Sequence, residues 1–234
     1  MTKPTLVLLP GLICDTALWS YQARAFEDDF EIFCPNLSDE EDLARLSARV
    51  LAGLPARFSL VGHSMGGYVA FEMMRQAPER IERLALIGTS ARGETDRQAR
   101  KRRKLIALSR HGMFKGVTSR LLNDLLHPSR RDDPALARTI TEMAARAGRE
   151  GFISQQKAIL SRVDSRDLLK GINCPTLVVC GRDDQMVPPE LSTEIANEVP
   201  KAEMVWIEDC GHLPPLEKPE MTTDALRVWV DLKD

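Results

Sequence analysis

FSLVGHSMGGYVAFEMM, residues 58–74, places Ser64 between Gly62 and Gly66 in the pattern G-x-S-x-G. The apolar run before the serine is typical of a buried strand, and the apolar residues after it recur at helical spacing. A strand, a tight turn and a helix would hold the serine in a strained backbone conformation with its hydroxyl projecting. The glycines leave out the Cβ atoms that would clash there. The stretch therefore predicts a nucleophilic serine, the alternative being that Ser64 only caps the helix.

Short apolar runs alternate with helical patterns along the rest of the chain. This alternation predicts an α/β fold, with a mostly parallel sheet of about six strands and helices on both faces. The expected strands are 5–9, 31–34, 58–61, 83–88, 176–181 and 203–208, and the expected helices are 16–27, 40–53, 65–77, 188–198 and 218–232. Because ligands of such sheets bind outside the carboxyl ends of the strands, the loops that follow the strands are where chemistry is expected.

One region breaks this alternation. Residues 92–171 show helical periodicity without a convincing strand. We therefore expect a core built from residues 1–91 and 172–234, with a helical cap inserted between them over the loop ends of the sheet.

Composition and charge limit the function classes that fit the chain. Its 234 residues are 43% hydrophobic and 28% charged, and a net charge of -2 gives no reason to expect nucleic acid or a membrane surface as a partner. No apolar run approaches the length that spans a bilayer, and residues 1–11 lack the long apolar region of a secretory signal, so we expect a cytoplasmic protein. Five cysteines without C-x-x-C spacing favour reduced thiols over disulfides or a metal site.

A serine hydroxyl is a weak nucleophile at neutral pH and needs a base, usually a histidine that is held by a carboxylate. The chain has four histidines: His63, His111, His127 and His212. His63 flanks the serine on a sharp turn, where neighbouring side chains project differently, and the next two fall in the helical insertion. His212 follows the last strand on the loop side of the sheet, which favours it as the base. The strand before it is followed by two candidate acids, Asp183 and Asp184.

The loop after strand 176–181 carries a further motif. Gly181, Asp184 and Pro188 fit G-x-x-D-x-x-x-P, and the chain order of Ser64, Asp184 and His212 is nucleophile, acid, histidine. On these motifs the chain resembles the α/β-hydrolase superfamily over nearly its whole length, above all the small Ser-His-Asp esterases, enol-lactonases and carbon–carbon bond hydrolases. The resemblance implies that the second aspartate, Asp184, is the acid and that the leading hairpin of most such relatives is missing here.

Attack on a carbonyl creates a negative oxygen, which backbone N–H groups can stabilise. One donor should be the N–H of Met65, the residue after the serine. The resemblance implies that the second donor comes from the loop after the first strand, where relatives have His-Gly and this chain has Pro10-Gly11. We place this donor at the N–H of Leu12. Leu12, Ile13 and His63 are the expected substrate-binding residues.

These features predict a serine hydrolase that cleaves a small carboxylic ester or lactone through an acyl-enzyme on Ser64. His212 would serve as base and acid, Asp184 would orient it, and neither a metal nor an organic cofactor would be needed. A carbon–carbon bond hydrolase or an acyltransferase could use the same residues. A small-molecule binding protein on a hydrolase scaffold is the alternative from another class.

The run RQARKRRK, residues 97–104, has two interpretations. A solvated helix face is the commoner origin of such a run, and the functional alternative is attraction of an anionic substrate or carrier, with Arg100 and Arg103 as its best contacts. A nucleic-acid binder would require binding that falls steeply with salt. We expect a small-molecule partner and a monomer or homodimer.

Overall fold

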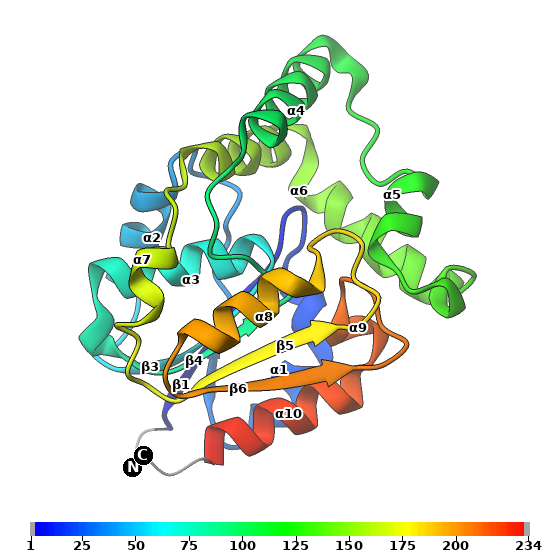
Figure 1. Ribbon diagram of the computed structural model, residues 1–234. Helices are drawn as coiled ribbons and strands as arrows, with labels where there is room; N and C mark the ends of the chain where they lie inside the picture. Colours follow the sequence, from blue (N-terminus) through cyan, green and yellow to red (C-terminus); the bar gives the residue numbers. More distant parts are fainter. Residues whose placement is uncertain (1–2, 232–234) are drawn as a thin grey trace.

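A parallel sheet forms the centre of the fold in the computed structural model, which describes residues 3–231. Its six strands are hydrogen-bonded in the order β2-β1-β3-β4-β5-β6, and every neighbouring pair is parallel (Figure 1). The strands are β1 (Thr5–Leu9), β2 (Glu31–Phe33), β3 (Phe58–His63), β4 (Ile81–Ile87), β5 (Thr176–Gly181) and β6 (Ala202–Ile207). The predicted fold class is confirmed, and no strand precedes β1 among the described residues.

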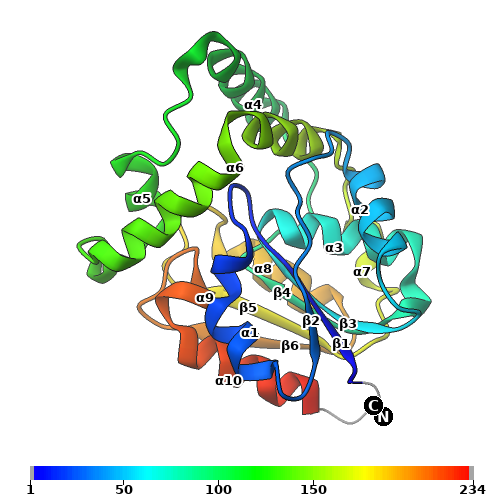
Figure 2. The same ribbon diagram turned by 180° about the vertical axis from the view of Figure 1, so that it is seen from behind.

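Alternate residues of the strands pack against two helical layers, since successive side chains of a strand point to opposite faces. One face buries Val7, Leu60, Leu86 and Val178 with residues of α2, α3 and α8. The other buries Leu8, Val61, Ile87 and Val179 with residues of η1, α1, α9 and α10 (Figures 1 and 2). The helices of these layers are η1 (Thr16–Trp19), α1 (Ser20–Phe26), α2 (Leu43–Ala52), α3 (Met65–Gln76), η2 (Pro78–Arg80), α8 (Pro189–Glu198), α9 (Pro214–Glu217) and α10 (Pro219–Asp231).

Two expected helices differ at their ends for local reasons. The helix expected over residues 16–27 is divided into η1 and α1. The helix expected over residues 40–53 begins at Leu43, because the Asp42 side chain accepts the N–H of Arg45 and so caps α2 at that point.

The chain between β4 and β5 is helical, as the sequence predicts. Its elements are α4 (Asp96–Leu108), η3 (Ser109–Met113), α5 (Ser119–Leu125), η4 (Pro128–Arg130), α6 (Pro134–Ser161) and α7 (Arg166–Leu169). Helices α4, α5 and α6 stand above the sheet in both views (Figures 1 and 2). No helix within residues 3–231 is long and apolar enough to cross a membrane.

Helix α6 bends at Gly148, whose φ of 64° and ψ of -174° lie outside the helical region. Only glycine adopts such a conformation readily, so the bend is a property of this position. The first half of α6 packs Ile140 and Met143 against the layer of α1 and α10. The second half packs Ala158 and Ile159 against the layer of α2 and α3. The bend therefore lets one helix contact both halves of the core.

Candidate active site

Ser64 occupies the turn between β3 and α3, with φ 52° and ψ -112°. A non-glycine residue in such a conformation costs on the order of 1–3 kcal/mol and persists only where its surroundings enforce it. Two hydrogen bonds do so here: the Ser64 N–H donates to the carbonyl of Ile87 (2.9 Å), and the Thr89 hydroxyl donates to the carbonyl of Ser64 (2.8 Å). The turn is therefore tied to the end of β4 and to the loop after it.

Glycines around the serine allow the strand and the helix to approach closely. A Cβ atom at Gly62 would lie 2.6 Å from the carbonyl oxygen of Gly66, and one at Gly66 would lie 2.2 Å from that of Leu9. Gly67, which sequence reasoning did not single out, is equally constrained, because its Cβ would lie 2.3 Å from Thr89 Oγ1. Gly62 and Gly66 are thus set by backbone packing, and Gly67 is set by the side chain of Thr89.

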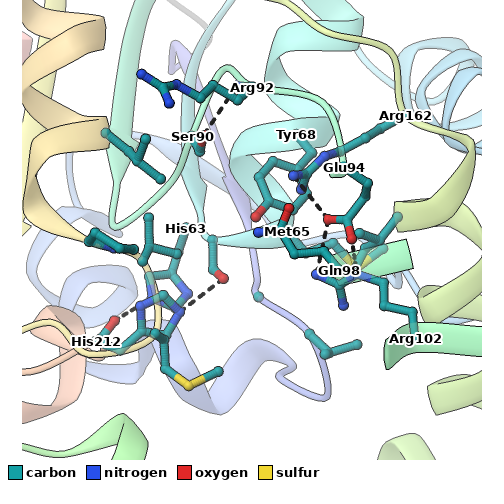
Figure 3. A pocket seen from close by; sticks show the side chains of 18 of the residues that line it. His63, Met65, Tyr68, Ser90, Arg92, Glu94, Gln98, Arg102, Arg162 and His212 are labelled. Atoms are coloured by element: carbon teal, nitrogen blue, oxygen red, sulfur yellow. Dashed lines mark hydrogen bonds and ion pairs between the residues drawn. The ribbon is translucent and has the colours of Figure 1, made fainter. Parts of the chain in front are cut away.

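The structure brings Ser64, His212 and Asp184 together. His212 Nε2 lies 2.9 Å from Ser64 Oγ (Figure 3), and His212 Nδ1 lies 2.7 Å from Asp184 Oδ2. The other oxygen of Asp184 accepts the N–H groups of Met186 and Val187, at 2.8 and 2.9 Å. Because the ionised carboxylate can only accept, His212 Nδ1 carries the proton and Nε2 is left to accept from the serine hydroxyl.

Asp183 and the two histidines of the helical insertion, His111 and His127, are not part of this hydrogen-bonded series. Asp183 is half exposed, and its Oδ2 lies 3.7 Å from His127 Nε2. His111 is exposed on η3. Of the two aspartates between which the residues alone left the choice open, Asp184 is the one whose carboxylate reaches His212.

Glu217 holds the loop that carries His212, and sequence reasoning missed it. This buried carboxylate accepts the N–H groups on both sides of the histidine, from Gly211 (3.2 Å) and Leu213 (2.9 Å), together with that of His127 (2.7 Å). The His212 N–H donates to the carbonyl of Leu125. In the sequence nothing distinguishes Glu217 from the exposed Glu220 three residues later.

His63 lines the cavity beside the serine, but its Nε2 atom faces the protein backbone. Its Nε2 lies 2.7 Å from the carbonyl oxygen of His212. Burial, and secondarily the neighbouring His212, lowers the pKa of His63 to about 3. The ring is therefore neutral at ordinary pH, with its proton on Nε2, because a carbonyl can only accept.

The loop after β1 lies next to the serine. The Cys14 N–H donates to the Gly11 carbonyl (3.1 Å), and Ile13 has φ 54°. The Ile13 N–H is used by the side chain of Gln155 (2.8 Å). The N–H groups of Leu12 and Met65, two residues that line the cavity, have no hydrogen-bond partner within residues 3–231.

A cavity of about 760 Å³ adjoins Ser64. Its lining includes apolar side chains from the core and from the helical insertion: Ile13, Leu121, Leu125, Ile140, Ile159 and Leu213. Burial raises the pKa of the lining Cys14 thiol to about 12, so that this thiol is protonated at neutral pH. Among the described residues no three His, Cys, Asp or Glu side chains are grouped as a metal site needs.

The far end of the cavity is charged, a feature that sequence reasoning did not find. Glu94 pairs with Arg102 (2.9 Å) and with Arg162 (3.0 Å), whose guanidinium carbon lies 3.8 Å from the centre of the Tyr68 ring (Figure 3). Arg102 is thus the member of the basic run 97–104 that turns inward, whereas Arg100 and Arg103 are exposed.

Comparisons with known proteins agree with this geometry. A model of the alpha/beta hydrolase family matches residues 6–225. The pimeloyl-[acyl-carrier protein] methyl ester esterase of Vibrio parahaemolyticus is 26% identical in an alignment that covers 90% of this chain and 88% of that protein. A malate-bound structure of a thermophilic esterase from Thermogutta terrifontis has a TM-score of 0.91 at 30% identity, covering 98% of this chain and 90% of that one. The enol-lactonase of Burkholderia xenovorans LB400 has a TM-score of 0.89 at 23% identity, covering 99% and 93%, and supports the fold alone.

Proposed function

Because this chain belongs to the α/β-hydrolase family of enzymes, we propose that it is a serine hydrolase that cleaves a small carboxylic ester or lactone through an acyl-enzyme on Ser64. The observation that carries the proposal is the hydrogen-bonded series from Ser64 Oγ through the His212 ring to Asp184. A series of nucleophile, base and orienting carboxylate is what activates a serine hydroxyl at neutral pH.

In the first half of the reaction, Ser64 Oγ attacks the carbonyl carbon and His212 Nε2 takes the hydroxyl proton. Asp184 keeps the proton on Nδ1 and stabilises the imidazolium that forms. Its own two N–H donors, from Met186 and Val187, hold the carboxylate in place without competing for the oxygen that faces His212. When the tetrahedral intermediate collapses, the leaving alcohol takes the proton from Nε2.

The negative oxygen of the intermediate needs donors that are already oriented. The N–H groups of Met65 and Leu12 are proposed for this role, because both residues line the cavity at the serine and both N–H groups are unused by the described protein. Each such donor contributes on the order of 2.7–4 kcal/mol to lowering the barrier. The Ile13 N–H is excluded as a donor, because Gln155 accepts it.

In the second half of the reaction, water replaces the alcohol. His212 Nε2 takes a proton from this water as the water attacks the acyl carbon, and then returns the proton to Ser64 Oγ. The same three side chains, Ser64, His212 and Asp184, thus serve both halves of the reaction. This chemistry requires no metal or organic cofactor.

The cavity supports a small substrate. Its volume of about 760 Å³ lies in the range of roughly 300–1,000 Å³ usual for small-molecule sites. Residues 92–171 are proposed to act as a cap, since α4, α5 and α6 contribute residues that line the cavity. The choice between a monomer and a homodimer stays a prediction.

Stopped-flow hydrolysis of short-chain p-nitrophenyl esters tests the proposal. We expect a burst of about one nitrophenol per chain followed by a slower steady rate, and no burst with Ser64→Ala. If the native protein neither bursts nor turns over any ester, simple ester hydrolysis is wrong, and carbon–carbon bond substrates become the next class to assay. If Ser64→Ala turns over as fast as the native protein, Ser64 is not the nucleophile.

A further inference from the structure

The side chain of Gln155 joins α6 to the loop after β1. Gln155 is fully buried; its Oε1 accepts the N–H of Ile13 (2.8 Å), and its Nε2 donates to the hydroxyl oxygen of Ser38 (3.1 Å). A backbone N–H can only donate, so the atom facing Ile13 must be the amide oxygen, and the amide nitrogen must face Ser38. Both ends of the amide are used, which leaves one orientation for the side chain.

The partner of Gln155 is an unusual piece of backbone. Ile13 has φ 54°, a conformation that a β-branched residue rarely adopts and that persists only where contacts enforce it. The Ile13 N–H belongs to the peptide unit that also contains the Leu12 carbonyl, and this unit is planar. Fixing the Ile13 N–H therefore also fixes the Leu12 carbonyl, which points to the opposite side of the peptide plane. This restricts the backbone rotation of Leu12 and so the direction of the Leu12 N–H, which belongs to the preceding peptide unit.

We propose that Gln155 is a positioning residue for the oxyanion donor at Leu12: by accepting the Ile13 N–H, it keeps the loop after β1 in the conformation that aims the Leu12 N–H at the developing negative charge. This inference rests on the proposed function. Gln155 itself contacts neither the serine nor the substrate, and it acts through the backbone of Leu12 and Ile13.

The local packing of α6 explains how Gln155 reaches this loop. The bend at Gly148 redirects the second half of the helix. Gly151, one turn before Gln155, then lies so close to Ser38 that a Cβ atom on it would be 3.0 Å from Ser38 Cβ. A side chain at Gly151 would press on Ser38, the residue whose hydroxyl accepts from Gln155 Nε2. The helical insertion thereby takes part in the chemical step as well as in shaping the cavity.

The test compares Gln155→Met, which removes the acceptor, with Gln155→Glu, which keeps an oxygen facing Ile13 and lets the Ser38 hydroxyl donate to the other oxygen. Removal of an oxyanion donor lowers kcat by about 10²–10³-fold, so misplacing one through Gln155→Met should lower kcat by roughly 10- to 100-fold. KM should stay within about threefold, because the interaction is made with the transition state alone. Gln155→Glu should recover most of kcat.

A matched control is available on the same helix. Gln156 is also buried, but its side chain accepts a hydrogen bond from Arg102 and none from the loop after β1. Gln156→Met repeats the same substitution one residue away and should leave kcat within about threefold. Far-UV circular dichroism and thermal unfolding show whether each variant is folded, so that kcat is compared between folded proteins.

A second readout separates positioning from a purely structural role. A trifluoromethyl ketone adds reversibly to the serine oxygen and leaves a negative oxygen at the position of the intermediate's oxyanion. Its inhibition constant should rise for Gln155→Met by the same factor by which kcat/KM falls. An unchanged kcat, a loss confined to KM, or an unchanged inhibition constant would each overturn the inference. The proposed function is judged separately, by the absence of turnover in Ser64→Ala.

Discussion

The Nε2 atom of His63 lies 2.7 Å from the carbonyl oxygen of His212, so that the residue directly before the serine holds the backbone of the histidine that contacts that serine. The two rings also lie close together, with their centroids 4.9 Å apart. Gly11 makes room for this arrangement, since a Cβ atom there would lie 2.8 Å from His63 Nδ1. The end of β3 and the loop after β6 are therefore joined directly beneath the cavity.

Removing this hydrogen bond should destabilise the protein. His63→Leu leaves the buried carbonyl of His212 without its donor, at a cost of about 1–3 kcal/mol in the free energy of unfolding. Urea denaturation at pH 7 measures the loss. His111→Leu, at an exposed position, removes the same chemical group and should change the free energy by no more than about 0.5 kcal/mol. Equal effects of the two substitutions would contradict the assignment.

His63 should also make stability depend on pH. Burial lowers the pKa of this ring to about 3, whereas an unfolded chain has a histidine pKa of about 6.5. Below pH 6.5 the unfolded state binds a proton that the folded state does not. The contribution of His63 to the free energy of unfolding is therefore fully present above pH 6.5 and falls by about 1.4 kcal/mol per pH unit below it. Denaturation at pH 7, 6 and 5 should show this slope in the native protein and a slope shallower by up to that amount in His63→Leu.

The two neighbouring aspartates should behave differently on substitution. Asp184→Asn keeps the shape but can place an amide N–H against His212 Nδ1, which disfavours the tautomer that leaves Nε2 free to accept. The analogous loss in a Ser-His-Asp protease lowers kcat by about 10⁴-fold, and we expect a loss of that order. Asp183→Asn, at the half-exposed neighbour, should leave kcat within about threefold. Comparable losses in the two variants would show that the acid is wrongly assigned.

Glu217 should matter for stability far more than its sequence neighbour does. Glu217→Ala leaves the buried N–H groups of Gly211 and Leu213, and the partly buried N–H of His127, without their acceptor. At about 1–3 kcal/mol for each unpaired donor, the free energy of unfolding should fall by at least about 3 kcal/mol. Glu220→Ala, at an exposed position, should change it by about 0.5 kcal/mol or less. A small effect of Glu217→Ala in chemical denaturation would refute this anchoring role.

Glu94 compensates two arginines at the far end of the cavity. The side chains of Glu94 and Arg162 are each 5% exposed, so that Glu94→Gln would leave the buried Arg162 and the partly buried Arg102 without their shared counter-charge. Breaking a buried pair in this way costs about 3–5 kcal/mol. Thermal and urea unfolding measure the loss, and Glu150→Gln, in an exposed pair with Arg149, is the control. A loss no larger than that of the control would mean that water or rearrangement compensates the arginines.

Local features of the sequence determined the sheet, its helices and the turn at Ser64. The apolar runs of β1 and β5 were predicted with their observed ends, because buried strands need continuous apolar residues. The turn was predictable for a similar reason. Its glycines, its preceding strand and its following helix are all within a few residues of the serine, so the signal is short-range.

Tertiary structure alone decided several of the contacts between distant groups. The motifs and the family resemblance already paired Ser64 with His212, which is 148 residues away. No sequence signal indicated that Ile13 meets Gln155, 142 residues away, or that His63 meets the backbone of His212, 149 residues away. Glu217 and Gln155 are ordinary polar residues in the sequence. They gain a role only because the fold buries them beside backbone N–H groups for which they are the acceptors. The physical reason is that a strand or a turn is set by neighbouring side chains and φ/ψ preferences. The acceptor of a buried N–H is set by the order of the strands and by the bend of α6, which bring segments together that share no local pattern.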